Sequence, residues 1–444
     1  MSQSPAAVAT LADLLTRARS ARDQGRPQEA AEAYARIADA DPAHVEALTF
    51  LGMRALAEER AEQAIGYFRR VLAQQPEDAL VLTHLGTALV AADRLAEAQQ
   101  ALQQAIALRS DLFIARLRLG HVLERLDDAH GALVQYFRAI NEAQLQGRWL
   151  SDATTHPSMR EAVKRAMLFV DAERFRLFDG AIAPLRERYG AGELARVERC
   201  LRIYLQLEEP AYADPRQRPK FLYFPGLPTQ PYFPTALFPW IEGFETETAA
   251  IRDEMLAVLA ADSGFEPFLT FRRPEDMSGY LAGSRGTPAW NAFFFYRHGR
   301  RYDENCRRCP HTAKVLDDLP LVRIRDHAPE ICFSVLTAGS HILPHRGVTN
   351  TRVVVHLPLV VPGANQCALV AGGEAHYWRE GRAMAFDDTF EHEAWNRSEA
   401  TRVIVLMDAW NPYLTEAERA AVAELVAAIG DFNREAGLPD LLEA

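Results

Sequence analysis

Two short stretches of the chain each place a histidine beside β-branched or aromatic residues. Residues 345–358 read HRGVTNTRVVVHLP, and residues 386–396 read FDDTFEHEAWN. Similar short runs occur from about Trp290 onward, in AFFFYRHG, ICFSVLTAG, AMAFDDTF and TRVIVLMDAW, and they are separated by Gly, Pro, Asn or Asp. Many short strands without intervening helices predict a β-sandwich or barrel of the jelly-roll type.

Polar residues interrupt these expected strands on faces that are otherwise apolar. Because side chains alternate along a strand, Arg352, Val354 and His356 share one face, and Arg402 shares a face with Ile404. Burying a charged or titratable group is unfavourable unless an anion or a metal ion meets it. The pattern therefore indicates a binding site on these strands.

The first third of the chain repeats itself with a period of 34 residues. Three sets of residues recur in register: Ala30, Ala64, Ala98 and Ala132; Tyr34, Phe68, Leu102 and Tyr136; and Gly52, Gly86 and Gly120. Helix-turn-helix units with this pattern bury their faces only against neighbouring units. The period resembles that of tetratricopeptide repeats, about four of them over residues 9–145. Such a solenoid has a groove that binds a peptide or a partner protein, although some arrays only cap or dimerise.

The composition divides the rest of the chain. Residues 146–209 keep helical patterns and are expected to form a connector, whereas residues 210–239 contain eight prolines and exclude regular helix. We expect a second domain over residues 210–444, closed by a helix that begins with a capping box of Thr415 and Glu418. The predicted fold class is α+β and multidomain, with an all-α solenoid followed by a jelly-roll domain.

The overall composition excludes some classes of protein. Lys and Arg number 49 against 60 Asp and Glu, and the net charge of −11 argues against a nucleic-acid or anionic-membrane partner. The sequence has no run of 18 apolar residues and no signal-peptide pattern, so we expect a cytoplasmic location and no membrane partner. Five cysteines fit a reducing compartment, and the pair in CRRC at 306–309 lacks the second pair of a zinc site.

The motifs of the second domain resemble those of a known enzyme family. Residues 333–362 read FSVLTAGSHILPHRGVTNTRVVVHLPLVVP, and residues 373–412 read GEAHYWREGRAMAFDDTFEHEAWNRSEATRVIVLMDAWNP. Together they resemble the aspartyl/asparaginyl β-hydroxylases, which are Fe(II)- and 2-oxoglutarate-dependent oxygenases on a double-stranded β-helix of cupin-like type. The resemblance covers about Phe221 to Pro412. Tetratricopeptide repeats before such a domain also occur in this family.

The resemblance implies metal ligands and a catalytic carboxylate. His345 and His392 match the two iron ligands of the family. Its members have a glycine, here Gly347, where the usual two-histidine site adds a carboxylate. Asp388 matches a carboxylate that hydrogen-bonds a metal-bound water, although Asp387 and Asp388 also suit a turn.

The resemblance also implies binding residues for the cosubstrate and the substrate. Ser334 and Arg402 match the pair that binds the distal carboxylate of 2-oxoglutarate, and His356 matches a residue near its other carboxylate. Arg352 matches an arginine near the residue that is hydroxylated. Animal members have a further arginine two positions later, where this chain has Val354, so their substrate preference does not transfer directly.

The activity implied by the resemblance is that of a 2-oxoglutarate-dependent dioxygenase. With Fe(II), 2-oxoglutarate and O2, it would hydroxylate the β-carbon of an aspartyl or asparaginyl residue in a peptide or protein that the repeats help to recruit. One alternative is the same core acting on a non-peptide substrate such as a lipid acyl chain. A second is a repeat-based scaffold with an inactive barrel. A third is a zinc or manganese cupin isomerase, which leaves Arg402 unexplained.

Overall fold

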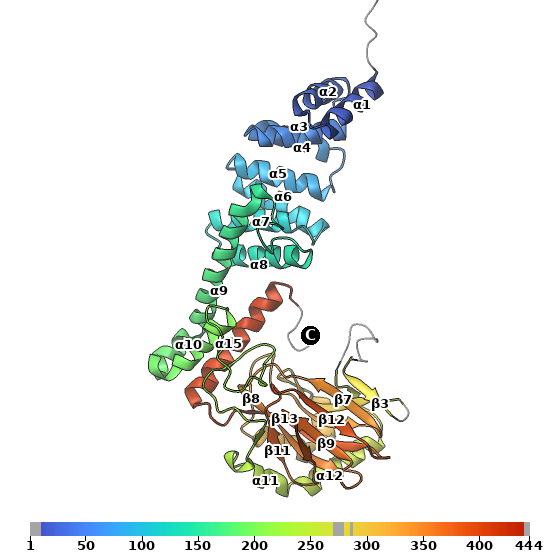
Figure 1. Cartoon of the computed structure of the whole chain (residues 1–444), viewed down its shortest axis with the longest axis vertical. Coiled ribbons are helices and arrows are strands. Elements are labelled where there is room, and N and C mark those ends of the chain that lie inside the picture. The colour runs from blue at the N-terminus through green and yellow to red at the C-terminus, as the bar shows by residue number, and fades with distance from the viewer. Residues whose placement is uncertain (1–9, 270–278, 285–286, 439–444) are drawn as a thin grey trace, which may run out of the picture. The chain divides into compact units, whose positions relative to one another are not determined.

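The chain divides into two compact units, residues 1–174 and 175–444 (Figure 1). A computed structural model describes residues 10–269, 279–284 and 287–438. The boundary between the units falls inside helix α9 (Arg160–Tyr189), within the segment that the sequence predicts as a helical connector.

Helical hairpins stacked in a row make up most of the first unit (Figure 1). Its helices are α1 (Leu11–Asp23), α2 (Pro27–Ala40), α3 (Val45–Ala57), α4 (Ala61–Leu72), α5 (Ala79–Ala91), α6 (Leu95–Leu108), α7 (Phe113–Arg125) and α8 (Ala129–Leu145). A β-carbon at Gly52 would lie 2.6 Å from the Phe68 ring, and one at Gly86 would lie 2.5 Å from Leu102. Glycine is therefore needed where two helices cross closely, and this close approach explains one position of the 34-residue period.

Two antiparallel sheets form the centre of the second unit. The larger sheet has the strand order β1-β11-β8-β13-β6-β4-β2, with β5 paired to β4, and the smaller has the order β10-β9-β12-β7-β3. The strands are β1 (Tyr232–Phe233), β2 (Glu266–Pro267), β3 (Leu281–Gly283), β4 (Trp290–Arg297), β5 (Arg300–Arg301), β6 (Ile331–Leu336), β7 (Ser340–His345), β8 (Arg352–Val360), β9 (Cys367–Ala371), β10 (Glu374–Tyr377), β11 (Met384–Phe386), β12 (His392–Asn396) and β13 (Arg402–Trp410). The prediction of a β domain after the helical repeats is confirmed, and its sheets are antiparallel.

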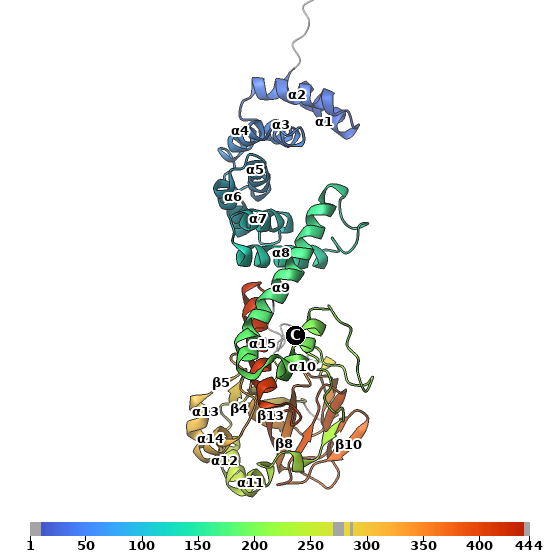
Figure 2. The same ribbon diagram turned by 90° about the vertical axis from the view of Figure 1, so that its left-hand side faces the viewer.

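Alternate residues of the long strands face two different cores. In β8, Val353 and Val355 belong to a core with helices, whereas Val354 belongs to a core with residues of the smaller sheet such as Ile342 and Ala394. The helices of the first core are α11 (Ile241–Thr246), α12 (Thr248–Ala260), α13 (Asp303–Arg308) and α14 (Pro310–Asp318), gathered on one side of the sheets (Figure 2). The larger sheet thus lies between these helices and the smaller sheet.

The second unit also contains helices outside this sandwich. Besides the second half of α9, they are α10 (Ala195–Tyr204), α15 (Glu416–Glu435) and the short 3-10 helices η2 (Ala191–Leu194) and η3 (Thr235–Leu237), while η1 (Pro157–Met159) belongs to the first unit. The capping box of Thr415 and Glu418 at the start of α15 is confirmed. Arg196 of α10 pairs with Glu418 at 2.6 Å.

The structure bears on two further expectations. Within the described part of the chain, no helix combines the length and apolarity needed to cross a bilayer. All five cysteines are buried free thiols, including Cys306 and Cys309 of the CRRC motif.

Candidate functional site

Two histidines from neighbouring strands lie side by side between the sheets. His345 ends β7, His392 begins β12, and the two are register partners with ring centroids 4.1 Å apart. Each ring donates its Nδ1–H to a backbone carbonyl, Leu343 O at 2.8 Å and Phe390 O at 3.1 Å. Burial lowers the pKa of each histidine to about 4, so both rings are neutral at pH 7. Both Nε2 lone pairs are therefore available to a metal ion.

Asp388 occupies the space beside Gly347. The Gly347 N–H donates to the Asp388 carbonyl at 2.6 Å, and the Asp388 carboxylate fills the volume that a side chain at 347 would need. One oxygen of this carboxylate, Oδ2, accepts a hydrogen bond from Arg352 at 3.4 Å, whereas Oδ1 is buried without a partner in the described part of the chain. Asp388 therefore presents an unused acceptor close to the two histidines.

Arg402 places a positive charge in the interior of the second unit. Its side chain, on β13, is 1% exposed and packs over the Trp378 ring with its guanidinium carbon 4.8 Å from the ring centroid. It donates long hydrogen bonds of 3.4 Å to Ser334, and its Nε is buried without a partner among the described residues. Burial lowers the pKa of Arg402 to about 10, which leaves it charged at pH 7. A buried cation in this state is stabilised by an anionic ligand.

His356 has no hydrogen-bond partner among the described residues for either ring nitrogen. The ring, on β8, is 5% exposed and lies 5.9 Å from the Trp378 ring and 5.2 Å from the Phe386 ring. Burial, followed by the charge of Arg402, holds the pKa of His356 well below its ordinary value. A neutral imidazole with two unused nitrogens adds a donor and an acceptor near the Arg402 guanidinium.

Arg352 is engaged by two buried carboxylates. Its Nη1 contacts Asp408 Oδ1, and its Nη2 donates to Asp388 Oδ2 at 3.4 Å. The Glu330 N–H also donates to Asp408, at 3.0 Å. The structure thus places Arg352 behind Asp388, as part of a chain of charges that holds the carboxylate in position.

Several residues of this site are not among those predicted from the sequence. Asp408 faces the same way as Arg402 because the two are an even number of positions apart on β13, so the alternation that identified Arg402 could have identified it. Trp378 gave no comparable signal, because its contact with Arg402 depends on tertiary structure. Asp387 accepts hydrogen bonds from Gln217 Nε2 at 2.6 Å and from the Thr389 N–H at 2.9 Å, as expected for a turn residue.

The chemistry of these side chains fits a metal ion and a small dicarboxylate. Among the described residues, no group of three or more His, Cys, Asp or Glu side chains is placed to hold a metal ion together. His345 and His392 offer two neutral nitrogen donors, which leave the other coordination positions to ligands from outside the chain. Arg402, Ser334 and His356 offer buried donors suited to carboxylate groups.

Parts of the chain match the models of two known families. Residues 245–412 match the family model described as aspartyl/asparaginyl beta-hydroxylase, and residues 15–79 and 55–117 match tetratricopeptide repeat models. The chain therefore carries an aspartyl/asparaginyl beta-hydroxylase domain together with tetratricopeptide repeats, as the sequence motifs predict.

Relatives of this domain are named for different activities. Aspartate beta-hydroxylase domain-containing protein 2 of Xenopus tropicalis is 33% identical over 248 residues, which cover 54% of this chain and 63% of that protein. Aspartyl/asparaginyl beta-hydroxylase of Homo sapiens is 33% identical over 200 residues, 44% of this chain and 25% of that protein. Ornithine lipid ester-linked acyl 2-hydroxylase of Rhizobium tropici is 32% identical over 192 residues, 43% of this chain and 64% of that protein. The chain spans less than two thirds of the length of each.

Proposed function

We propose that this protein is an Fe(II)- and 2-oxoglutarate-dependent dioxygenase that hydroxylates the β-carbon of an aspartyl or asparaginyl residue in a peptide or protein. The observation that carries the proposal is the neutral pair His345 and His392 in the same interior as Arg402, a buried cation without a counter-ion among the described residues. The pair supplies metal ligands, and the cation supplies an anchor for a carboxylate. A barrel used only for packing has no need of both.

Each residue would have a defined task. His345 and His392 would hold Fe(II), which when bound would supply the activation of O2 with 2-oxoglutarate as the reductant. The two backbone carbonyls that accept from the Nδ1 atoms fix the ring orientations. Arg402 and Ser334 would bind the distal carboxylate of 2-oxoglutarate, and His356 would donate to the other one. Asp388 would accept a hydrogen bond from water in the site.

The strand order supports a double-stranded β-helix as the finer description of the sheets. Consecutive strands β6, β7, β8 and β9 alternate between the larger and the smaller sheet, and β11, β12 and β13 do the same. Such alternation winds the chain around a common axis, which places the ends of β7 and β12 next to each other. We infer that the two histidines lie at one end of this barrel.

The substrate class has a second candidate. Arg352 is engaged by Asp388 and Asp408, and Val354 is apolar, so neither offers a free cation for a substrate carboxylate. One relative of similar identity is named for hydroxylation of an ester-linked acyl chain of ornithine lipid. A lipid acyl chain is therefore the alternative substrate.

The cytoplasmic location stays a prediction.

The first test is titration of the purified protein with Fe(II) and 2-oxoglutarate without oxygen. We expect the visible metal-to-ligand charge-transfer band of such complexes in the parent, its loss in His392→Ala, and a need for at least tenfold more 2-oxoglutarate in Arg402→Ala. His341→Ala is the matched control, because His341 lies on the same strand as His345 but pairs with Glu393 at 2.7 Å. A folded parent without the band would contradict the proposal.

The second test separates the substrate classes. The loaded enzyme is incubated with peptides that contain Asp or Asn and, separately, with ornithine lipid, and the products are analysed by mass spectrometry. Addition of one oxygen to an Asp or Asn residue supports the peptide substrate. Addition to the lipid acyl chain alone assigns the alternative.

A further inference from the structure

One position of the 34-residue repeat is occupied by chemically different residues in successive repeats of the first unit. Phe50 in α3, His84 in α5 and Arg118 in α7 are each 34 residues apart and occupy equivalent positions. The Phe50 ring lies 4.5 Å from Tyr34, and the His84 ring lies 5.6 Å from Phe68. Equivalent positions of stacked repeats lie on the same face of a solenoid. This face is therefore apolar near α3 and basic near α7.

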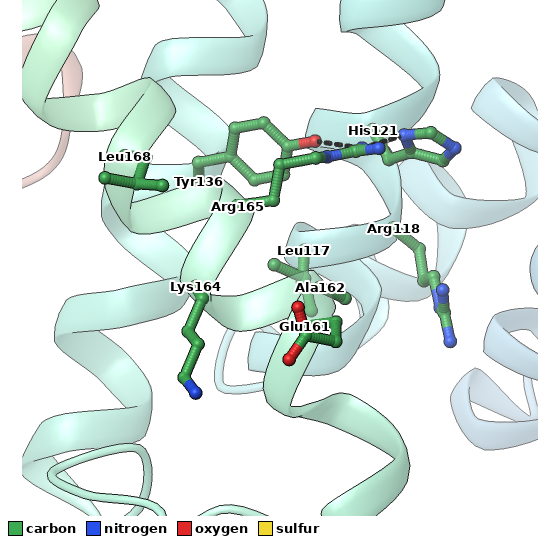
Figure 3. Close-up of a pocket in the computed structure, with 9 residues that line it drawn as sticks. All are labelled: Leu117, Arg118, His121, Tyr136, Glu161, Ala162, Lys164, Arg165 and Leu168. Atoms are coloured by element: carbon green, nitrogen blue, oxygen red, sulfur yellow. Dashed lines mark hydrogen bonds between the residues drawn. The ribbon is translucent and has the colours of Figure 1, made fainter.

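A cavity lies at the basic end of this face. Its volume is about 620 Å³, and its walls come from α7, α8 and the first part of α9 (Figure 3). The residues that line it are Leu117, Arg118, His121, Tyr136, Glu161, Ala162, Lys164, Arg165 and Leu168. Three of them carry a positive charge and one a negative charge, so the cavity is cationic in a chain whose net charge is −11.

Two of the three cations already have partners. Arg165 donates to Glu124 at 3.3 Å and to the Tyr136 hydroxyl at 3.4 Å, the latter contact being visible in Figure 3. Lys164 lies 3.6 Å from Asp152. These two charges are largely balanced by the protein itself.

Arg118 differs from them. Among the residues that the structure describes, it forms no ion pair, although Glu161 lines the same cavity. Its Nη2 contacts the Met159 sulfur at 3.9 Å, and its Nε is buried without a partner in the described ranges of the chain. Burial lowers the pKa of Arg118, because removing the charged guanidinium from water is unfavourable and no carboxylate of the described residues pairs with it. A carboxylate that enters the cavity would supply it.

The other end of the face has a cavity of opposite character. It has a volume of about 760 Å³ and is lined by Tyr34, Phe50 and Met53, with Met53 49% exposed. The charged side chains on its wall are paired, for example Arg54 with Glu58 at 2.7 Å. An apolar side chain suits this end.

We propose that this face of the repeat unit binds an extended segment of a protein partner, with an apolar side chain at Phe50 and Met53 and an aspartate or glutamate at Arg118. Charge complementarity at Arg118 selects an acidic segment, and the two cavities fix its direction along the repeats. The binding does not depend on the hydroxylase chemistry, so its failure and a failure of the iron site are separate results.

The experiment is fluorescence anisotropy with the full chain at low ionic strength. The probe is a fluorescein-labelled peptide with leucines at one end and glutamates at the other, and the comparison peptide has glutamine in place of glutamate. We expect Arg118→Gln to weaken binding of the glutamate peptide about tenfold and to abolish the difference between the two peptides. Arg125→Gln is the matched control, because Arg125 lies on the same helix outside the cavity. Met53→Ser should weaken the binding of both peptides equally.

Three outcomes would overturn the inference. One is the absence of measurable binding of the glutamate peptide to the parent. Another is equal binding of the glutamate and glutamine peptides to the parent, a comparison that needs no variant to fold. The third is a single-stranded oligonucleotide that displaces the peptide and loses affinity in Arg118→Gln, since that result would assign the cavity to phosphates.

Discussion

Gly347 lies so close to Asp388 that a β-carbon at position 347 would overlap the Asp388 carboxylate. A non-bonded heavy atom essentially never lies within 3.0 Å of a β-carbon in a protein. The carboxylate atoms of Asp388 would lie much closer than this to a β-carbon at position 347. A carboxylate two residues after His345, as in the common three-ligand site, therefore has no room here. The glycine is a steric consequence of where Asp388 lies.

Enlarging Gly347 should destabilise the protein without creating a metal ligand. We expect Gly347→Ala to lower the free energy of unfolding by about 1–3 kcal/mol, the usual effect of overpacking. Gly347→Asp should also lower the free energy of unfolding and should not tighten Fe(II) binding. Combining it with Asp388→Gly should restore the free energy of unfolding. Gly243→Ala is the control, because a β-carbon there would have no atom of the described residues outside its own helix within 4 Å. Chemical denaturation and Fe(II) titration check both effects, and an unchanged midpoint for Gly347→Ala would contradict the steric argument.

Replacing Arg402 by an apolar residue should separate stability from ligand binding. Because the guanidinium is buried without a counter-ion in the described part of the chain, Arg402→Met should leave the melting temperature of the ligand-free protein unchanged or higher. The same change should remove the rise in melting temperature that 2-oxoglutarate causes with metal present. Arg397→Met is the control, since Arg397 packs over Trp395 instead. A full 2-oxoglutarate effect in Arg402→Met would show that the cosubstrate is held elsewhere.

Breaking the contact between Arg352 and Asp408 should be costly because both side chains are buried. Removing one partner of a buried ion pair typically costs about 3–5 kcal/mol, so we expect Arg352→Met and Asp408→Leu each to fall in that range. The double variant should cost clearly less than the sum. The exposed pair Arg325 and Asp431, 2.6 Å apart, is the matched control, for which we expect at most about 1 kcal/mol. Additive effects at the buried pair would contradict its coupling.

Asp387 should give the protein a distinctive pH dependence. Burial raises the pKa of Asp387 to about 6, so the folded state binds this proton more tightly than the unfolded state. Its favourable contribution is complete below about pH 4 and is lost as the pH rises through about 6. Asp387→Asn should therefore be more stable than the parent at pH 7, by at most about 3 kcal/mol, and equally stable at pH 4.

Melting temperatures at pH 7, 5 and 4 would test this prediction. Asp214→Asn is the control of opposite sign, because its hydrogen bonds with Arg216 lower the pKa of Asp214. A difference between Asp387→Asn and the parent that does not vary with pH would count against a raised pKa.

Local patterns in the sequence predicted those parts of the fold that depend on periodicity. The 34-residue period identified the helical hairpins because a glycine meets a bulky side chain at the same place in three successive units, as Gly52 meets Phe68. Strand alternation placed Arg352 and His356 on one face of their strand and Arg402 on the same face as Ile404 in another, because neighbouring side chains of a strand point to opposite sides. The roles of these residues in binding stay predictions.

The sequence by itself determined the repeat unit, the antiparallel strands and the residue types of the site, since each follows from short-range spacing and from motifs. Only the tertiary structure decided what those residues touch. It brought Asp388 against Gly347, engaged Arg352 with Asp408, and left Arg402 beside Trp378 without a counter-ion among the described residues. These contacts join segments that are not adjacent in the chain, and how strands and loops meet across the sheets depends on the packing of the whole domain, which no local pattern encodes.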